Sequence, residues 1–129
     1  MTSVIESIGG EEAVRRLVER FYDIIESAPE GAAIHDLHLQ GHGLAHVRRE
    51  QFDFMCGFLG GRRRYAERHG HMNLRALHEH LPIRPQDAGA WLACMSRALD
   101  ETGIEGPDRA RIDAAFDRAA RILVNRPDP

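Results

Sequence analysis

The sequence predicts an all-α fold. Apolar residues recur at the i, i+3, i+4 spacing of a helix over most of the chain, and pairs of glycines and prolines interrupt this pattern where helices would end. No stretch alternates apolar and polar residues as a half-buried strand does. With 129 residues, 43% of them hydrophobic, the chain suffices for one core but not two, so we expect a single domain over residues 1–129.

Net charge limits the kinds of binding partner, and cysteine content indicates the cellular compartment. A formal net charge of -3 gives no electrostatic basis for binding nucleic acid or an anionic membrane surface. Cys56 and Cys94 lie inside helical patterns and are expected to be buried, reduced thiols. Because no segment resembles a membrane span or a secretion signal, we expect a cytoplasmic protein.

The first third of the chain predicts two helices separated by Gly9-Gly10. Ser3 is a suitable cap for a short helix through Ile8. The second helix begins at Glu11 and ends at 28–31, where Pro29 and Gly31 stand. Its predicted buried face consists of Val14, Leu17, Val18, Phe21 and Ile25.

Tyr22 lies beside that buried face, one turn after Val18. Its ring is therefore expected inside the molecule, where the hydroxyl needs a hydrogen-bond partner. A backbone carbonyl is the ordinary partner for a core tyrosine, and a bound ligand is the alternative.

The next segment, residues 32–46, is rich in histidine. His35, His38, His42 and His46 are spaced by three, four and four residues, which on a continuous helix would align them for a divalent metal. Two glycines, at 41 and 43, interrupt such a helix. The spacing therefore favours a solvated polar loop over a zinc site, and leaves a haem-free metal protein as an alternative.

A helix is predicted from Leu44 to Leu59, ended by the glycine pair at 60 and 61. Gln51 interrupts its apolar stripe and directs an amide toward the core. Three arginines at 62–64 are expected to form a solvated face. The stripe itself consists of Leu44, Val47, Phe54, Met55 and Phe58.

Residues 73–81 predict a further helix, on which His78 shares the face of Leu74, Leu77 and Leu81. A buried imidazole needs a partner for each ring nitrogen, which a hydrogen-bonding group, a water molecule or a metal can supply. The neighbouring His80 points elsewhere.

Two more helices follow. Pro85 and Asp87 suit the first turn of a helix that ends near Gly103. Its predicted inner face includes Trp91, whose indole N–H is costly to bury without an acceptor. The last helix begins at 106–108 and ends before Pro127. The two inner faces consist of Ala88, Trp91, Leu92, Met95 and Leu99, and of Ile112, Ala115, Phe116, Ala119 and Leu123.

Four different helices thus carry a polar group on a buried face: Tyr22, Gln51, His78 and Trp91. Each would cost about one to several kcal/mol if buried without a partner. A shared ligand that takes one nitrogen on one side and hydrogen-bond donors on the other removes this cost. Haem iron with a bound diatomic molecule fits that description.

The ordered set of motifs resembles the group II truncated haemoglobins over nearly the full chain. It comprises the glycine pairs 9–10 and 60–61, the pair Phe21-Tyr22, and GGRRRYAERHGHMNLRALHEHLPI followed by AWLACMSRAL. The resemblance implies a two-over-two helical sandwich around haem b. It makes His78 the proximal iron ligand and places Trp91 and Tyr22 in the distal pocket. It also implies propionate contacts from Arg75 and Tyr65, and haem contacts from Val47, Phe54, Leu74 and His71.

The chain departs from the family pattern in LHLQGHGLAH, residues 37–46, where an extra residue is required. His38 is our candidate for the distal position beside Tyr22. Counting back from the glycine pair at 60–61 places Val47 and Gln51 on the distal face, and a shift of one residue would replace Val47 with His46.

These residues predict a five-coordinate ferrous haem protein that binds O2, NO or CO. Tyr22, Trp91, Gln51 and His38 could each donate a charge-assisted hydrogen bond of about 1.5–3 kcal/mol to bound O2. We therefore expect slow O2 release and redox chemistry on NO or peroxide, supported by an external reductase, in a monomer or homodimer. The alternative is a haem-based sensor or carrier without turnover.

Overall fold

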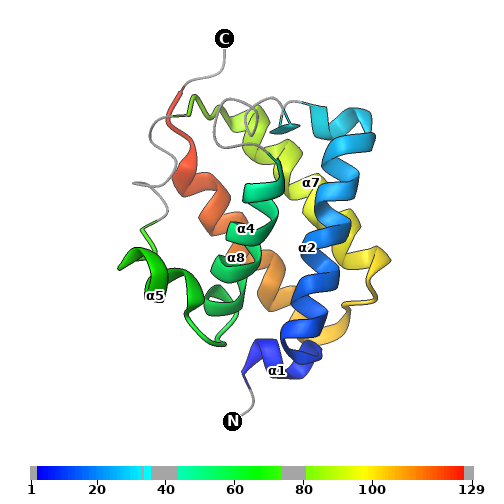
Figure 1. The fold of residues 1–129 in the computed structure, drawn as a ribbon. Coiled ribbons are helices and arrows are strands. Elements are labelled where there is room, and N and C mark those ends of the chain that lie inside the picture. The colour runs from blue at the N-terminus through cyan, green and yellow to red at the C-terminus, as the bar shows by residue number, and fades with distance from the viewer. Residues whose placement is uncertain (1–2, 33, 36–43, 74–80, 127–129) are drawn as a thin grey trace.

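The computed structural model describes residues 3–32, 34–35, 44–73 and 81–126, and within them it is helical with no strand (Figure 1). This confirms the all-α prediction. None of the described helices has the length and apolar character that a membrane span requires. The elements are α1 (Val4–Ile8), α2 (Gly10–Ser27), the 3₁₀ turn η1 (Pro29–Gly31), α4 (Leu44–Phe58), α5 (Arg64–His69), α7 (Pro85–Glu101) and α8 (Gly106–Leu123).

Two pairs of long helices form the body of the molecule. α2 packs against α4, α7 packs against α8, and contacts between α2 and α7 join the two pairs (Figure 1). The short α1 lies under α2, and α5 extends from the end of α4. This arrangement is the predicted two-over-two sandwich.

The two glycine pairs fix how α1 docks on α4. Gly9 has a φ of 116°, in the left-handed region that glycine adopts readily, and so turns the chain between α1 and α2. A Cβ on Gly61 would lie 2.8 Å from Cδ1 of Ile5 and 3.0 Å from the carbonyl oxygen of Cys56. Only glycine permits this approach, which lets the Ile5 amide donate to the Leu59 carbonyl at 3.0 Å.

The predicted helix ends are largely confirmed. The side chain of Ser3 accepts a hydrogen bond from the Glu6 amide at 3.4 Å and caps α1. Gly60, with a φ of 94°, follows the end of α4. Asp87 accepts from the Arg84 amide at 2.9 Å and so stabilises the first turn of α7.

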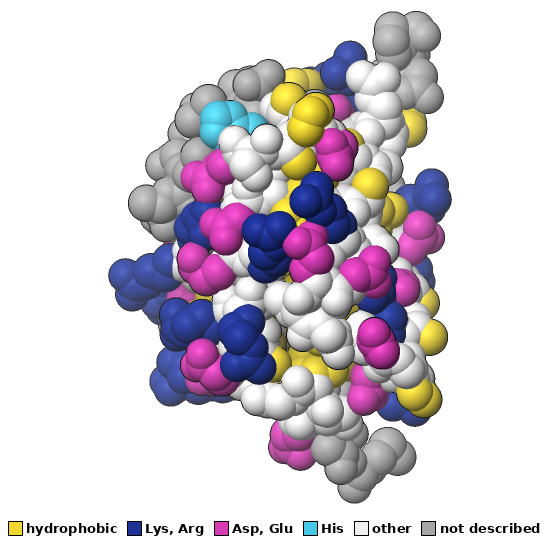
Figure 2. Space-filling view, turned by 90° about the vertical axis from the view of Figure 1, so that its right-hand side faces the viewer, with side chains coloured by type: hydrophobic (Ala, Val, Ile, Leu, Met, Phe, Trp, Pro, Cys, Tyr) yellow, Lys and Arg dark blue, Asp and Glu magenta, His cyan; other side chains and the backbone are white. Residues whose placement is uncertain are grey.

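The core lies between α2 and the other long helices. Cys56 and Cys94 are buried free thiols, as predicted. Apart from the cysteines, the largest fully buried side chains are Leu17, Phe21, Tyr22, Ile24, Ile25, Met55, Met95, Leu99 and Ile112. The face in Figure 2 shows basic and acidic side chains interleaved over the surface, with apolar atoms between them.

Some burial predictions were wrong in detail. Trp91 and Leu92 are packed against the core but are only partly buried. Along α8, Ala120 is buried where Ala119 was expected. Asp53, a carboxylate that the stripe of α4 did not reveal, is 8% exposed.

The arginines at 62–64 were predicted to form a solvated face, but two of them make ion pairs within the protein. Arg62 binds Glu67 of α5 at 2.8 Å, and Arg64 reaches back to Glu11 of α2 at 3.0 Å. The predicted helix at 73–81 lies mostly outside the described residues.

Candidate functional site

Tyr22 occupies a fully buried position in the second half of α2. Its ring packs edge-on against Phe21, with centroids 4.9 Å apart. The hydroxyl lies 3.5 Å from Oε1 of Gln51 on α4. Two polar groups that the sequence placed separately on buried faces are therefore brought together.

The Tyr22–Gln51 contact is a weak hydrogen bond, because hydroxyl bonds in proteins are typically about 2.7–2.8 Å long. A glutamine amide can present either its oxygen or its nitrogen, and the two orientations are distinguished by their hydrogen bonds. With the oxygen toward Tyr22 the hydroxyl donates to Gln51, and with the nitrogen toward it the hydroxyl accepts. The pair can thus rearrange without moving either helix.

The Tyr22 hydroxyl stays protonated at any physiological pH. Burial raises the pKa of Tyr22 far above its ordinary value, and the smaller opposing effect of Arg48 does not reverse this. The Arg48 guanidinium lies 5.7 Å from the centre of the Tyr22 ring. A buried, neutral phenol is a hydrogen-bond donor, which is what a ligand with developing negative charge requires.

Trp91 of α7 lies between α2 and α8. Its ring is 5.3 Å from Phe21 and 5.3 Å from Phe116, centroid to centroid. Among the described residues, no acceptor is found for the indole N–H. A partly buried N–H without an acceptor among the described residues can donate a hydrogen bond to a ligand.

Aromatic rings continue from Trp91 across α8 and α4 to α5. Phe116 stacks on Phe58 at 5.5 Å with planes 1° apart, and Phe58 stacks on Phe54 at 6.1 Å. Phe54 in turn meets the edge of Tyr65 at 5.4 Å. The candidate site is therefore bordered by flat apolar surfaces.

Several apolar residues on the predicted inner faces of α4 and α7 are only partly enclosed by protein. Val47 and Phe58 of α4, and Trp91 and Leu92 of α7, pack on the core with one side and retain some exposure. Partly exposed apolar walls, together with the Trp91 N–H and the Tyr22–Gln51 pair, fit a large flat apolar group that carries a polar ligand. The residues present thus fit haem.

Tyr65 is buried on α5, next to a set of ion pairs that sequence reasoning missed. Its ring lies 4.3 Å from that of His69, whose Nε2 contacts Glu50 at 2.8 Å. Arg68 binds both Glu50, at 2.6 Å, and Asp53, at 2.5 Å. These contacts hold α5 and Tyr65 against α4, and no local spacing could have revealed them.

The same set of ion pairs sets the ionisation of its members. Burial acts to raise the pKa of Glu50, but hydrogen bonds from Arg68 and His69 outweigh it and leave that pKa below its ordinary value. Burial, and then the nearby Glu50, raise the pKa of Tyr65. Glu50 is therefore a carboxylate and Tyr65 a neutral phenol.

The remaining predicted site residues are placed only in part. His71 is exposed, and its Nδ1 accepts from the Asn73 amide at 3.1 Å. The other four, His38, Leu74, Arg75 and His78, lie outside the described residues. No group of three possible metal ligands occurs in the part of the chain that the structure describes.

Comparison with known proteins agrees with this geometry. The bacterial-like globin family matches residues 3–125. A group 2 truncated hemoglobin, YjbI of Bacillus subtilis, is 38% identical over 117 residues, covering 91% of this chain and 85% of the relative.

Solved structures are similar over nearly the whole chain. The group II 2-on-2 hemoglobin of Agrobacterium tumefaciens gives a TM-score of 0.91 at 36% identity, covering 98% of this chain and 96% of that one. A truncated oxygen-avid haemoglobin from Bacillus subtilis gives 0.86 at 36% identity, covering 96% and 100%. Globins bind haem and, through it, diatomic gases. The chain therefore belongs to the bacterial-like globin family, with the two-over-two fold of the group II truncated haemoglobins.

Proposed function

We propose that the protein binds haem b through His78, leaves the ferrous iron five-coordinate, and holds O2 tightly for redox chemistry on NO or peroxide. The contact between the buried Tyr22 hydroxyl and the partly buried Gln51 carries this proposal. It brings together hydrogen-bonding groups from two helices, next to the ring of Phe21, which also contacts Trp91. Haem supplies an iron that binds a diatomic ligand and shifts electron density onto it.

The distal residues act by donating hydrogen bonds to that electron-rich ligand. The Tyr22 hydroxyl keeps its proton because it is buried, and the Gln51 amide can turn so that Tyr22 accepts from it and directs its own proton elsewhere. The Trp91 N–H provides a second donor from α7. Two donors of about 1.5–3 kcal/mol each slow the release of ligand by some two to four decades.

The similarity to a truncated haemoglobin described as oxygen-avid supports slow release in this chain also. A slowly released ligand suits reaction on the haem better than delivery to a distant site. Oxidation of NO to nitrate, or reduction of peroxide, leaves oxidised iron, so turnover needs electrons from outside. An external reductase is the expected partner.

At the edge of the haem, Arg75 and Tyr65 are proposed to contact the propionates. The neutral phenol of Tyr65 can donate to a carboxylate, and α5 is held in place by Arg68. His38 remains our candidate for a further distal group, and Val47, Phe54, Leu74 and His71 for contacts with the haem.

The absorption spectrum of the purified, haem-loaded protein tests the iron ligand. We expect a Soret band typical of a five-coordinate ferrous globin, and its loss or displacement in His78→Ala. His80→Ala is the matched control, because His80 is expected to point away from the haem. A band unchanged in His78→Ala but lost in His80→Ala would contradict the assignment.

The proposed chemistry has its own test. The O2-loaded protein is mixed with one equivalent of NO, and nitrate is measured along with the rate at which ferric protein forms. Stoichiometric nitrate supports the NO reaction. Release of O2 without nitrate would leave a haem protein that binds gases but does not oxidise NO.

A further inference from the structure

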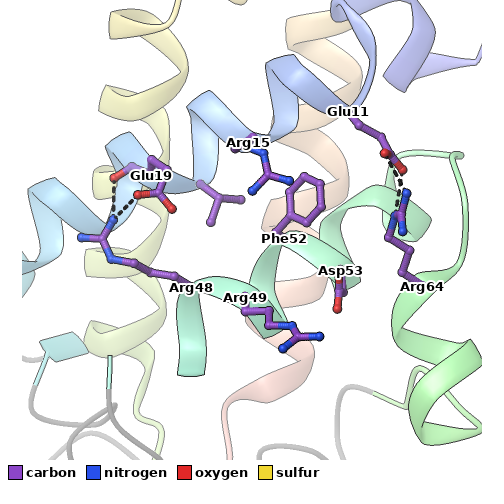
Figure 3. Close-up of a pocket in the computed structure, with 9 residues that line it drawn as sticks. Glu11, Arg15, Glu19, Arg48, Arg49, Phe52, Asp53 and Arg64 are labelled. Atoms are coloured by element: carbon purple, nitrogen blue, oxygen red, sulfur yellow. Dashed lines mark hydrogen bonds and ion pairs between the residues drawn. The ribbon is translucent and has the colours of Figure 1, made fainter. Parts of the chain in front are cut away.

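A cavity lies between α2 and α4, and one of its lining residues, Arg48, is also 5.7 Å from the centre of the Tyr22 ring. It is a half-open groove of about 610 Å³ between α2, α4 and the start of α5 (Figure 3). Four arginines and three carboxylates line it, together with two apolar side chains. The lining residues are Glu11, Arg15, Val18, Glu19, Arg48, Arg49, Phe52, Asp53 and Arg64.

Both ends of the groove are closed by ion pairs. At one end Arg64 makes two hydrogen bonds of 3.0 Å with the carboxylate of Glu11. At the other end Arg48 binds the Glu19 side chain at 2.8 Å (Figure 3). The charges of these two arginines are therefore already neutralised by carboxylates of the protein.

The middle of the groove is different. The Arg15 guanidinium lies over the ring of Phe52, 4.3 Å from its centre, and Arg49 projects from the preceding turn of α4 (Figure 3). Within the described residues, neither Arg15 nor Arg49 has a carboxylate partner. The two acidic residues that follow Arg49 on α4, Glu50 and Asp53, are engaged by Arg68 at 2.6 and 2.5 Å.

The centre of the groove thus carries two uncompensated positive charges beside a phenyl ring, on a chain whose net charge is -3. A guanidinium stacked on an aromatic face keeps its N–H edge free for a carboxylate or phosphate. Holding Arg15 on Phe52 also removes part of the entropy cost of ordering its long side chain.

We propose that this groove binds a small planar organic anion carrying a single phosphate or carboxylate group. The anionic group would lie between Arg15 and Arg49, and the flat apolar part would lie along Phe52 and Val18. Arg15, Arg49 and Phe52 are not among the residues assigned to the haem, so this proposal does not depend on how the iron is used.

The ends of the groove restrict the ligand. Glu11 and Glu19 would repel a chain of several phosphates that extended beyond the centre. Their pairing with Arg64 and Arg48 leaves little positive charge to attract it. The groove therefore favours one anionic group over a polyphosphate.

Isothermal titration of the haem-loaded protein in the carbon monoxide form tests this proposal. FMN serves as the probe because it joins a planar ring to one phosphate, and riboflavin is the matched ligand without the phosphate. We expect FMN to bind more tightly than riboflavin, and its affinity to fall as salt is raised. Equal affinity for the two flavins would overturn the proposal.

Variants locate the binding. Arg49→Gln and Arg15→Gln should each weaken FMN binding about three- to fivefold, the effect expected for a solvent-exposed ion pair. Arg118→Gln is the control, because Arg118 is an exposed arginine of α8 outside the groove, and it should bind FMN like the unaltered protein.

Phe52→Leu should weaken both flavins alike, because it removes the stacking surface and leaves the charges in place. If Arg118→Gln lowered FMN affinity as much as Arg49→Gln, binding would reflect surface charge in general, and the groove would not be a site. Absence of FMN binding at millimolar concentration would also refute it.

Discussion

The two faces of α4 differ in how their polar side chains are paired. Toward the groove, the long side chain of Arg48 is surrounded by the carboxylates of Glu19, Asp23 and Glu26 on α2. Toward the interior, Oε1 of Gln51 lies 3.5 Å from the Tyr22 hydroxyl. Arg48 thus has three carboxylate partners on the groove side of α4, while Gln51 makes one long hydrogen bond with the Tyr22 hydroxyl on the inner side.

This difference in pairing indicates which side chains contribute to stability and which are available to a ligand. The ion pairs of Arg48 hold α2 and α4 together, and the charge of Arg48 is therefore not available to a ligand. A hydrogen bond as long as the one from the Tyr22 hydroxyl to Gln51 can be exchanged for a bond to a ligand at small cost to the fold. Substitutions at Tyr22, Gln51 and Trp91 should therefore change O2 binding, and substitution of Arg48 should change stability.

The largest effect is expected from Trp91→Phe on the inner side. A phenyl ring can keep the packing against Phe21 and Phe116 but lacks the N–H. We predict that O2 dissociates about tenfold faster, since one charge-assisted hydrogen bond is lost. Stopped-flow mixing with carbon monoxide measures this rate.

Ala93→Ser is a suitable control for that change, because Ala93 is an exposed residue on the same helix. It should release O2 at the rate of the unaltered protein. An unchanged rate in Trp91→Phe would remove Trp91 from the distal site and weaken the contrast between the faces.

On the outer face, Arg48→Met should lower the free energy of unfolding by about 1–2 kcal/mol, because it leaves three carboxylates on α2 without their shared cation. Arg49→Met is the matched control one residue later. It should change stability by less than about 0.5 kcal/mol, because Arg49 has no ion pair in the described structure. Urea denaturation followed by circular dichroism measures both.

Equal destabilisation by Arg48→Met and Arg49→Met would show that the ion pairs of Arg48 contribute nothing specific. A large change in O2 release in Arg48→Met, without a change in stability, would mean that Arg48 acts mainly on the Tyr22 ring that it overlies.

The smallest effect concerns the ion pair at the end of the groove. The hydrogen bond from Arg64 lowers the pKa of Glu11, so the pair stabilises the fold above the unfolded-state pKa of a glutamate. This stability is lost as the pH falls through the lowered pKa of Glu11. Arg64→Gln should therefore be slightly less stable at pH 7 and indistinguishable from the unaltered protein at pH 2.

Thermal denaturation at the two pH values measures this difference. Glu12→Gln is a useful comparison, because Glu12 is exposed and has only a 4.0 Å ion pair with Arg16. A deficit in Arg64→Gln that persisted at pH 2 would indicate lost packing rather than lost charge pairing.

Local pattern was enough to predict most helices. Ser3, the glycine pairs and Pro85 act within a few residues of themselves, so their consequences can be read from the chain. The inward positions of Tyr22 and Gln51 follow equally from helical periodicity. The resemblance of the motifs to a family supplied the two-over-two arrangement, which periodicity alone cannot provide.

What the sequence could not predict depends on pairing between distant helices. The distance from Tyr22 to Gln51, across 29 positions, requires the packing of α2 on α4. The engagement of Asp53 by Arg68 follows from how α5 folds back. That Arg15 has no carboxylate partner among the described residues can likewise be seen only from the packing of its neighbours.

The most direct test of the central claim is the O2 dissociation rate of the protein compared with its own apolar version, Tyr22→Phe/Gln51→Leu/Trp91→Phe. If these three side chains hold bound O2, the unaltered protein should release it at least about a hundredfold more slowly than the triple variant. Haem content and the Soret band of the ferrous form should be the same in both. Equal rates in two proteins that both retain haem would contradict the account.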